Sequence, residues 1–415
     1  MKSRVGAAWA AWLIAVAYYF YQYILRSSTA VMMPQLTAAF GLSAAGVASL
    51  AGLFYYGYAP FSLVAGTAVD RLGPRVVIPA GALMAGAGAL LFGSGDLAAA
   101  QIGRFLQGAG GVFALIGAVY IVSSGFRASR AATLIGATQM FGAAGGSAGQ
   151  FFVGPMIGGG LAWSSFWTGM GIAGVTIAVS LFLLLPRPEA KRQHGDWLKG
   201  AATALGAVIT NPQSILCGLI AGLLFIPTTV FDMIWSVRFL QEGHGFDYGE
   251  AVIRSATVPL GWMIGSPLMG AISDRIGRRK PVIVGCGFVL LACLGWILYG
   301  QADVFPPYVL GLITGIVSGS AMLTYTVIKE ANPPQYGGTA TGVISLLNFG
   351  LSALVGPMLG GTVHSASAGT QPSLEHYQIA FHPLLYGVGL AIMLTLGLKE
   401  TGPAARIRLA TAEAA

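Results

Sequence analysis

The chain has 415 residues, of which 55% are hydrophobic and only 9% are charged, and its formal net charge is +8. Soluble proteins carry about 25% charged residues, so this composition excludes a water-soluble globule. The apolar residues form long continuous runs, which excludes the short alternating segments of a β-barrel and indicates a helical membrane protein.

Twelve segments can cross a membrane as helices, because a helix needs about 20 mostly apolar residues to span the hydrocarbon. They lie at residues 8–34, 43–69, 76–93, 97–124, 131–158, 163–185, 213–240, 249–272, 281–299, 305–328, 338–363 and 378–398. A secretory signal peptide would also begin with basic residues such as Lys2 and Arg4. However, the first run is too long for one and eleven spans follow it, so we expect it to be a span.

The first span carries a charge near its middle, in the stretch YYFYQYILRSST at residues 18–29. An arginine at the centre of a bilayer costs at least about 2.5 to 3.5 kcal/mol on insertion scales, so such a residue usually has a function. Tyr19, Gln22, Tyr23 and Arg26 recur at helical spacing and share one face. We predict that this face lines a substrate cavity; the alternative is that its aromatic residues form an interfacial belt.

The positive charges predict the orientation of the chain. With the N-terminus in the cytoplasm, 18 of the 22 lysines and arginines fall on the cytoplasmic side; Arg26, Arg104 and Arg254 lie within spans, and Arg238 lies at the outer end of the seventh. The positive-inside rule therefore places both termini in the cytoplasm, and the short loops favour a bacterial inner membrane. The net charge reflects this topology rather than a basic face that binds nucleic acid.

The second half of the chain repeats the first. The loop GTAVDRLGPR follows the second span and GAISDRIGRR follows the eighth, with Asp70 and Asp274 separated by 274 − 70 = 204 residues. The segments GPMIGG and GPMLGG begin at Gly154 and Gly356 and give 356 − 154 = 202. Two echoes at nearly the same offset indicate that six spans were duplicated in parallel. We expect bundles at residues 1–185 and 213–415, joined by a polar linker at 186–212 with a short surface helix at 198–209.

The repeated loop resembles the G-x-x-x-D-R-x-G-R-R signature of the major facilitator superfamily, and the resemblance covers essentially the whole chain. The second copy matches the signature fully, whereas the first has Pro74 in place of the first basic residue. The resemblance implies an all-α membrane protein of 12 transmembrane helices, built as two pseudo-symmetric six-helix bundles that rock around a midplane site. It also implies that the loops gate the inward side, because their charges can bond helix ends and neighbouring acids. A role in topology alone is the alternative. The predicted gating residues are Asp70, Arg71, Arg75, Asp274, Arg275, Arg278 and Arg279.

The start of the fourth span, GRFLQGAGG at residues 103–111, is similar to the R-x-x-x-G pattern of the superfamily. This similarity makes Arg104 a candidate for proton or conformational coupling, with helix bracing as the alternative. GPMIGG resembles the tail of a pattern associated with antiporters, but Gln150 replaces the upstream glycine. The direction of transport therefore stays open.

The repeat also suggests a partner for Arg26. Adding the offset gives 26 + 204 = 230, and the nearest charge in the seventh span is Asp232. Because charges inside a membrane are tolerated mainly when paired or hydrated, we expect the two to attract each other across the central cavity, with Asp232 taking the coupling proton. Thr228 and Trp235 share the Asp232 face, and we expect Pro227 to break the helix just before it. Further candidates for the cavity wall, for which packing is the alternative role, are Tyr120, Gln139, Tyr325 and Asn348.

The first helix also resembles that of organic-anion and organophosphate carriers, where an arginine at this place grips a carboxylate or phosphate. Organophosphate exchangers add a second arginine on the seventh helix, where this chain has Asp232, so a phosphate ester is disfavoured. We expect a secondary active transporter of a small carboxylate-bearing or zwitterionic organic solute, driven by protons. Efflux of drugs or metabolites by proton antiport is the alternative. A receptor or scaffold that kept the fold and lost transport is a further alternative, which the presence of both repeated loops disfavours.

No nucleotide-binding, metal-binding or catalytic motif stands out in the chain, so we expect neither an enzyme nor a cofactor. The expected partners are the solute, the coupling protons and the lipid bilayer, and the carrier is expected to act as a monomer.

Overall fold

The computed structural model describes residues 2–126, 128–185, 197–301, 304–367 and 370–403, and these residues form helices and short connections without a strand. The first bundle contains α1 (Lys2–Ser27), η1 (Ala30–Met32), α2 (Met33–Phe40), α3 (Ala44–Leu72), α4 (Pro74–Phe92), α5 (Leu97–Gly125), α6 (Ala128–Phe151), α7 (Val153–Gly158) and α8 (Trp163–Leu184). The second contains α10 (Pro212–Ile226), η2 (Pro227–Trp235), α11 (Ser236–His244), α12 (Tyr248–Ile276), α13 (Lys280–Tyr299), α14 (Val309–Ser318), α15 (Ala321–Glu330), η3 (Pro334–Tyr336), α16 (Gly337–Ala366) and α17 (Leu374–Leu396).

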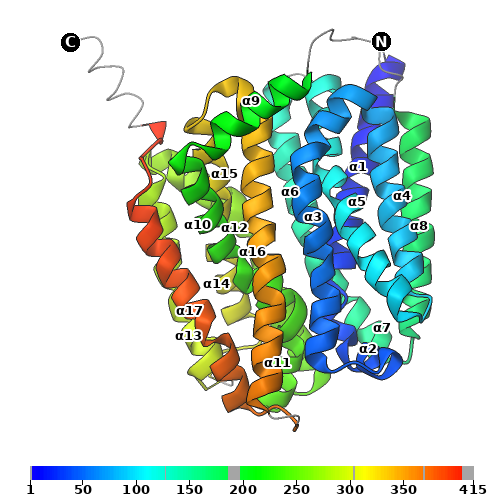
Figure 1. Ribbon diagram of the computed structural model, residues 1–415, viewed down its shortest axis with the longest axis vertical. Coiled ribbons are helices and arrows are strands. Elements are labelled where there is room, and N and C mark those ends of the chain that lie inside the picture. Colours follow the sequence, from blue (N-terminus) through cyan, green and yellow to red (C-terminus); the bar gives the residue numbers. More distant parts are fainter. Residues whose placement is uncertain (1, 127, 186–196, 302–303, 368–369, 404–415) are drawn as a thin grey trace.

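The two bundles stand side by side, and α9 (Trp197–Ile209) lies across one end of the molecule (Figure 1). We call this end the linker face; α1 begins there and α17 ends there (Figure 1). The opposite end, with α2, α7 and α11, is the far face (Figure 1). The arrangement confirms the predicted fold of twelve spans in two bundles. Residues 186–196 of the predicted linker lie outside the described residues, and α9 occupies the stretch expected to form a surface helix.

Ten helical segments among the described residues have the length and hydropathy of membrane spans. The other two spans are formed by α6 with α7 and by α12, which pack against each other between the bundles. Their positions explain their lower hydropathy, because a helix that faces another helix carries small and polar residues where a lipid-facing helix carries large apolar ones. Gln150 and Ser255 on these helices are both fully buried.

The bundles meet along two helix pairs, α3 with α16 and α6 with α12. The hydroxyl of Ser62 on α3 lies 3.2 Å from the carbonyl oxygen of Gly342 on α16, toward the linker face. Toward the far face, the Tyr248 hydroxyl at the start of α12 donates to the Val31 carbonyl oxygen at 2.8 Å. In this structure the bundles therefore contact each other on both sides of the midplane.

The seventh span is interrupted as the sequence predicts. Pro227 has no backbone N–H and breaks the α-helical ladder, and residues Pro227–Trp235 continue as a π-helix instead. Such π-helical turns are rare and often occur at functional sites, because the wider turn leaves backbone carbonyls and side chains in unusual positions. Asp232 lies within this turn.

Glycines at matching positions of the repeat bring helices into backbone contact. A Cβ atom on Gly57 of α3 would lie 2.1 Å from the Phe105 carbonyl oxygen of α5, and one on Gly261 of α12 would lie 2.2 Å from the Leu312 carbonyl oxygen of α14. The two glycines are 261 − 57 = 204 residues apart, the same offset as the loop aspartates. The duplication thus preserved a helix contact that only glycine permits.

Gly261→Ala should therefore lower stability. The added methyl group meets a backbone atom that cannot move aside, and overpacking of this kind costs about 1 to 3 kcal/mol. We expect a lower midpoint of thermal unfolding in detergent. Gly270→Ala is the control, because nothing lies within 4 Å of a Cβ atom there. Equal midpoints for the two variants would contradict the contact.

Candidate functional site

Arg26 lies in the last turn of α1 and is only 1% exposed. Its guanidinium carbon lies over five aromatic rings, at 4.6 Å from the centre of Tyr23, 5.0 Å from Phe54, 5.8 Å from Tyr55, 5.2 Å from Tyr58 and 5.1 Å from Phe349. We call these five rings the Arg26 box. Four of them come from α1 and α3 in the first bundle, and Phe349 comes from α16 in the second, so the box spans the bundle interface.

The box stabilises a cation without an acidic partner. Among the described residues, no carboxylate forms an ion pair with Arg26. The negative faces of aromatic rings attract a guanidinium, by about 0.5 to 2 kcal/mol for each well-placed ring, so several rings can offset much of the cost of burial. This arrangement answers why a charge is tolerated in the first span.

Several polar atoms around the box are buried without a hydrogen-bond partner. They include Nε and Nη1 of Arg26 and both amide atoms of Gln22, which lies one helical turn before it. Buried donors and acceptors are nearly always satisfied in native proteins, so these atoms call for bound water or a ligand. Unpaired guanidinium donors in an apolar setting can bind a planar anion through short, charge-assisted hydrogen bonds.

The second bundle contributes further polar groups. Tyr325 on α15 lies close enough to Arg26 and Tyr23 for electrostatic interaction. The amide nitrogen of Asn348 donates to the Tyr325 hydroxyl at 3.1 Å, while Oδ1 of Asn348 is buried without a partner. Thr228 is also buried with an unpartnered hydroxyl. Arg26, Tyr23, Tyr325 and Asn348 thus lie near one another in the structure, and their roles in binding stay predictions.

The structure corrects the expected pairing of Arg26 with Asp232. The aspartate lies two residues beyond position 230, the mate of Arg26 in the repeat, and two residues further along a helix a side chain lies on roughly the opposite face. Asp232 consequently points away from the box, and its Oδ1 accepts a hydrogen bond from the Ser255 hydroxyl at 3.1 Å. Its Oδ2 is buried without a partner. The Ser255 hydroxyl also lies 3.0 Å from Oε1 of Gln150, which brings α12 into contact with α6 of the first bundle.

The expected stripe on the seventh span is also divided. Trp235 is fully buried against α17, with its ring centre 6.4 Å from that of Tyr377 and 6.0 Å from that of Phe381. It is a packing residue of the second bundle in this structure and does not join the Arg26 box. The wider turn of the π-helix rotates Trp235 out of line with Thr228, which α-helical spacing could not predict.

The remaining candidates on the first bundle lie beside or away from the box. Tyr19 packs edge-on against Tyr23, with 5.2 Å between ring centres, and thereby supports a ring of the box. Tyr120 packs against the apolar core of the bundle. Gln139 has a buried Oε1 without a hydrogen-bond partner.

Arg104 braces the end of α1. Its Nη1 donates to the Leu25 carbonyl oxygen at 2.7 Å and its Nη2 to the Arg26 carbonyl oxygen at 3.2 Å, while its Nε donates to the Ala51 carbonyl oxygen of α3 at 3.1 Å. The last carbonyl groups of a helix lack partners within the helix, and Arg104 satisfies two of them. This geometry fits the bracing alternative, and a role in proton coupling stays a prediction.

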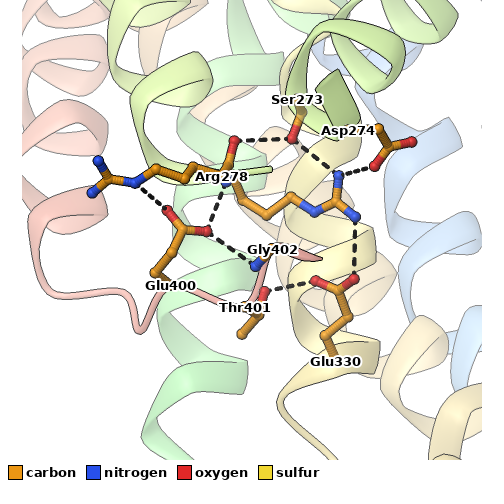
Figure 2. Close-up of polar contacts among 8 residues, drawn as sticks. Ser273, Asp274, Arg278, Glu330, Glu400, Thr401 and Gly402 are labelled. Atoms are coloured by element: carbon orange, nitrogen blue, oxygen red, sulfur yellow. Dashed lines mark hydrogen bonds and ion pairs between the residues drawn. The ribbon is translucent and has the colours of Figure 1, made fainter. Parts of the chain in front are cut away.

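The loop after α12 forms a polar network at the linker face (Figure 2). The Arg279 guanidinium donates to Asp274 Oδ1 at 2.5 Å, to the Ser273 hydroxyl at 3.0 Å and to Glu330 Oε1 at 3.2 Å. Burial alone would lower the pKa of Arg279, but its bonds to Glu330 and Asp274 outweigh burial and raise it, so the side chain stays charged. All of these partners belong to the second bundle.

Glu400, after α17, completes this network (Figure 2). Its carboxylate accepts hydrogen bonds from the backbone N–H groups of Arg279 at 2.7 Å and Lys280 at 3.2 Å, so Glu400 caps the start of α13. Its negative charge also interacts favourably with the positive end of the α13 helix dipole. Thr401 donates to Glu330 Oε2 at 2.6 Å. Residues 400–401, which follow α17, thus connect the loop to α15 through hydrogen bonds. This role was not predicted from the sequence.

The other predicted gating residues have different surroundings, and two of their side chains are not described by the structure. Arg278 is exposed and lies 3.9 Å from Glu400. Arg275 is exposed at the end of α12. Arg75, in the first copy of the loop, lies over the Phe182 ring of α8, 5.0 Å from its centre. The side chains of Asp70 and Arg71 lie outside the described residues.

The sequence analysis also missed four members of the box, Phe54, Tyr55, Tyr58 and Phe349. A signal was present in the stretch FYYGY at residues 54–58, where Tyr55 and Tyr58 are three residues apart and therefore share a face of α3. Tyr55 also reaches the second bundle, because its hydroxyl donates to the Thr229 carbonyl oxygen of η2 at 2.8 Å.

Comparisons with known proteins agree with this architecture. The sequence profile of the Major Facilitator Superfamily matches residues 14–357. Multidrug resistance protein 3 of Bacillus subtilis is 30% identical over 157 residues, which are 37% of this chain and 29% of that protein. The match thus spans less than a third of the Bacillus relative.

Two curated relatives match over most of their length. The membrane sensor protein UhpC of Salmonella typhimurium is 27% identical over 82% of this chain and 80% of the relative. The probable sulfoacetate transporter SauU of Cupriavidus necator is 22% identical over 87% of this chain and 88% of the relative. Among solved structures, a D-xylose-proton symporter has a TM-score of 0.68 at 16% identity, covering 95% of this chain and 98% of the symporter, and so shares the fold.

Arg104→Lys tests whether this residue braces α1. Lysine cannot reach all the carbonyl groups that the guanidinium bonds, and each buried group left unpaired costs about 1 to 3 kcal/mol. We expect a clearly lower midpoint of thermal unfolding and an unchanged pH profile of the remaining transport. Arg238→Lys is the control, because its ion pair with Glu242 is partly exposed and worth about 1 kcal/mol or less. Unchanged stability with a shifted pH profile would contradict bracing and support coupling.

Proposed function

The chain belongs to the major facilitator superfamily, and on that premise we propose that it carries a small organic carboxylate across the membrane, driven by protons that bind Asp232. Membership of the family makes it a multi-pass membrane transporter rather than an enzyme. The substrate class and the coupling ion are our proposal. The observation that carries it is a buried guanidinium with unpartnered donors between the two bundles.

A carboxylate suits this site because Arg26 has no anionic partner among the described residues. The two unpartnered nitrogens offer N–H groups to carboxylate oxygens, and the low polarity of the box strengthens such bonds. The rings around the cation would then pack against the carbon skeleton of the solute. Arg26 is best suited to this task, since a guanidinium keeps its charge and matches a planar anion.

The surroundings disfavour two neighbouring substrate classes. A phosphate dianion calls for a second cation, but the donors of Arg104 are occupied by backbone carbonyl groups. A zwitterion calls for an acceptor of its ammonium group, but Asp232 faces Ser255 instead of the box. The site therefore supports a simple carboxylate better than an amino acid or a phosphate ester.

Asp232 is the proposed proton carrier because it is a buried carboxyl group with one unpartnered oxygen and no ion pair among the described residues. Burying an ionised carboxylate without a countercharge is costly, and a proton is the simplest ligand that removes the charge. Its link through Ser255 to Gln150 supports the proposal further, since this link crosses the bundle interface.

We further propose that the linker face lies in the cytoplasm of a bacterial cell and that the protein acts as a monomer in the inner membrane. The positive-inside rule supports this orientation, because the sequence assigns 18 of the 22 lysines and arginines to the side expected to be cytoplasmic. In this orientation the Arg279 network lies on the inner side. It would hold the ends of α12, α13, α15 and α17 together as one body while the bundles move.

Efflux of drugs is the second candidate, favoured by the partial match to Multidrug resistance protein 3 and by the aromatic character of the box. A buried cation opposes it for cationic drugs, because like charges repel in a medium of low polarity. A thermal-shift screen of the purified protein against small carboxylates, amino acids, sugars and hydrophobic cations separates the candidates. Stabilisation by hydrophobic cations alone would favour efflux and contradict our proposal.

Arg26→Lys should weaken binding of the stabilising carboxylate at least ten-fold, a loss of about 1.4 kcal/mol, because an ammonium group cannot bond both carboxylate oxygens in a fork. The dissociation constant is measured by calorimetry on the purified variant. Arg238→Lys, at the far end of the seventh span, is the matched control and should bind as the native protein does. Undiminished affinity in Arg26→Lys would remove Arg26 from the binding site.

Asp232→Asn should abolish accumulation of the carboxylate driven by a pH gradient in proteoliposomes. Exchange of labelled for unlabelled solute should persist, because exchange needs no net proton movement. Asp247→Asn is the control, since asparagine can also cap the start of α12. Full proton-driven accumulation by Asp232→Asn would exclude Asp232 as the proton carrier.

A further inference from the structure

A cavity of about 60 Å³ lies inside the second bundle, next to Asp232. Its lining includes Asp232, Ser236, Arg254, Ser255, Val258 and Trp296. It runs from the buried aspartate to residues at the far-face ends of α13 and α14, such as Trp296 and Pro307. One buried water needs about 10 to 15 Å³, so the cavity has room for roughly four to six waters.

The cavity is separate from the Arg26 box. Every lining residue belongs to the second bundle, and none of the five rings of the box is among them. The stretch from Pro227 to Trp235 stands between the two sites, with the Thr229 carbonyl oxygen bonded to Tyr55 on one side and Asp232 lining the cavity on the other.

The hydroxyl groups next to the cavity have fewer hydrogen atoms to donate than oxygen atoms within hydrogen-bond distance. The Ser255 hydroxyl is close to three oxygens, those of Asp232 Oδ1, Gln150 Oε1 and the Ser236 hydroxyl, but it can donate only one hydrogen bond. The Ser236 hydroxyl is also bonded to the Asp232 carbonyl oxygen at 2.7 Å. Asp232 Oδ2 is unpartnered, so a proton or a water from the cavity would supply the missing bond.

We propose that this cavity is a dedicated path by which protons reach Asp232 from the far face without passing through the Arg26 box. The inference rests on the proposed function, in which Asp232 carries the coupling proton. The transfer is a simple protonation: a hydrated proton gives H⁺ to a carboxylate oxygen of Asp232, which becomes a neutral carboxyl group, and water is left behind.

The charged and titratable groups around the path are consistent with this role. Arg254 on α12 lines the cavity, and its guanidinium forms an ion pair with Glu250 at 2.7 Å. The guanidinium carbon also lies over the Phe246 ring. His244 lines the cavity from the end of α11. The Arg254 and Glu250 pair leaves little net charge at the mouth, so a proton meets no strong repulsion there.

The path can be tested with silver ions, which require no transport substrate. Ag⁺ is small and reacts with thiols that water can reach. Val258→Cys is made in a background in which Cys217, Cys286 and Cys293 are replaced by serine. We expect Ag⁺ applied from the far face of sealed vesicles to protect Val258→Cys from later labelling by a maleimide in denaturant. Ag⁺ applied from the linker face should give no protection.

Val230→Cys is the matched control, since Val230 is a fully buried valine of η2 that does not line the cavity. It should be labelled equally with and without Ag⁺. Adding Leu310→Trp to Val258→Cys should fill the cavity and remove the protection, while gel filtration checks that the double variant is folded. Absence of far-face protection of Val258→Cys, or equal protection with Leu310→Trp present, would overturn the path.

The outcomes of the two sets of experiments are distinguishable. If Asp232→Asn loses proton-driven accumulation but Val258→Cys is inaccessible from the far face, Asp232 carries the proton and the path is wrong. If Val258→Cys is protected but Asp232→Asn still accumulates solute, the cavity conducts water and the proposed coupling fails.

Discussion

The bundle interface is built around one buried cation, Arg26, which has no countercharge among the residues that the structure describes. Arg26 is held by ring faces from both bundles, so its environment is complete only when α1, α3 and α16 are together. Separation of the bundles on that side would remove Phe349 and expose the guanidinium to water. Closure around an empty site therefore has to place an unpaired charge among rings. In the proposed function, closure around an anion would neutralise that charge, and this difference would let the carrier move faster with its substrate than without it.

The backbone around Arg26 is fixed by groups that bind no solute. Arg104 bonds the final carbonyl groups of α1, and the close contact at Gly57 presses α3 against α5. The second bundle repeats the glycine contact at Gly261 but has Val230 at the position that matches Arg26. Duplication therefore gave both halves the same helix packing, while the sites that we propose for the anion and for the proton lie in different halves.

The sequence predicted what depends on composition, periodicity and repetition. The twelve spans, the two bundles and the break at Pro227 follow from apolar length, the offset of 204 residues and the missing proline N–H. The sequence also named Tyr325 and Asn348 as candidates for the cavity wall, but it did not show how close they lie to the Arg26 face. Side-chain direction around the seventh span was not predictable, because a π-helical turn changes the angle between successive residues. Asp232 lies two residues beyond position 230, and its side chain therefore contacts Ser255 instead of forming the expected ion pair with Arg26. The Phe349 contact depends on how two bundles dock, and no local pattern encodes it.

Because Arg26 and Asp232 do not touch in this structure, coupling between anion and proton cannot rest on a direct exchange of partners here. The element common to both sites is η2. Its Thr229 carbonyl oxygen accepts from Tyr55 of the box, and three residues later its Asp232 side chain bonds Ser255, which reaches Gln150 of the first bundle. A π-helical segment can return to α-helical hydrogen bonding by a shift of one residue, which would rotate Asp232 and Thr229 together. In the proposed mechanism, protonation on one side of η2 and anion binding on the other bias the same turn. An element with two arrangements that both ligands influence is the physical requirement for linkage between separate sites.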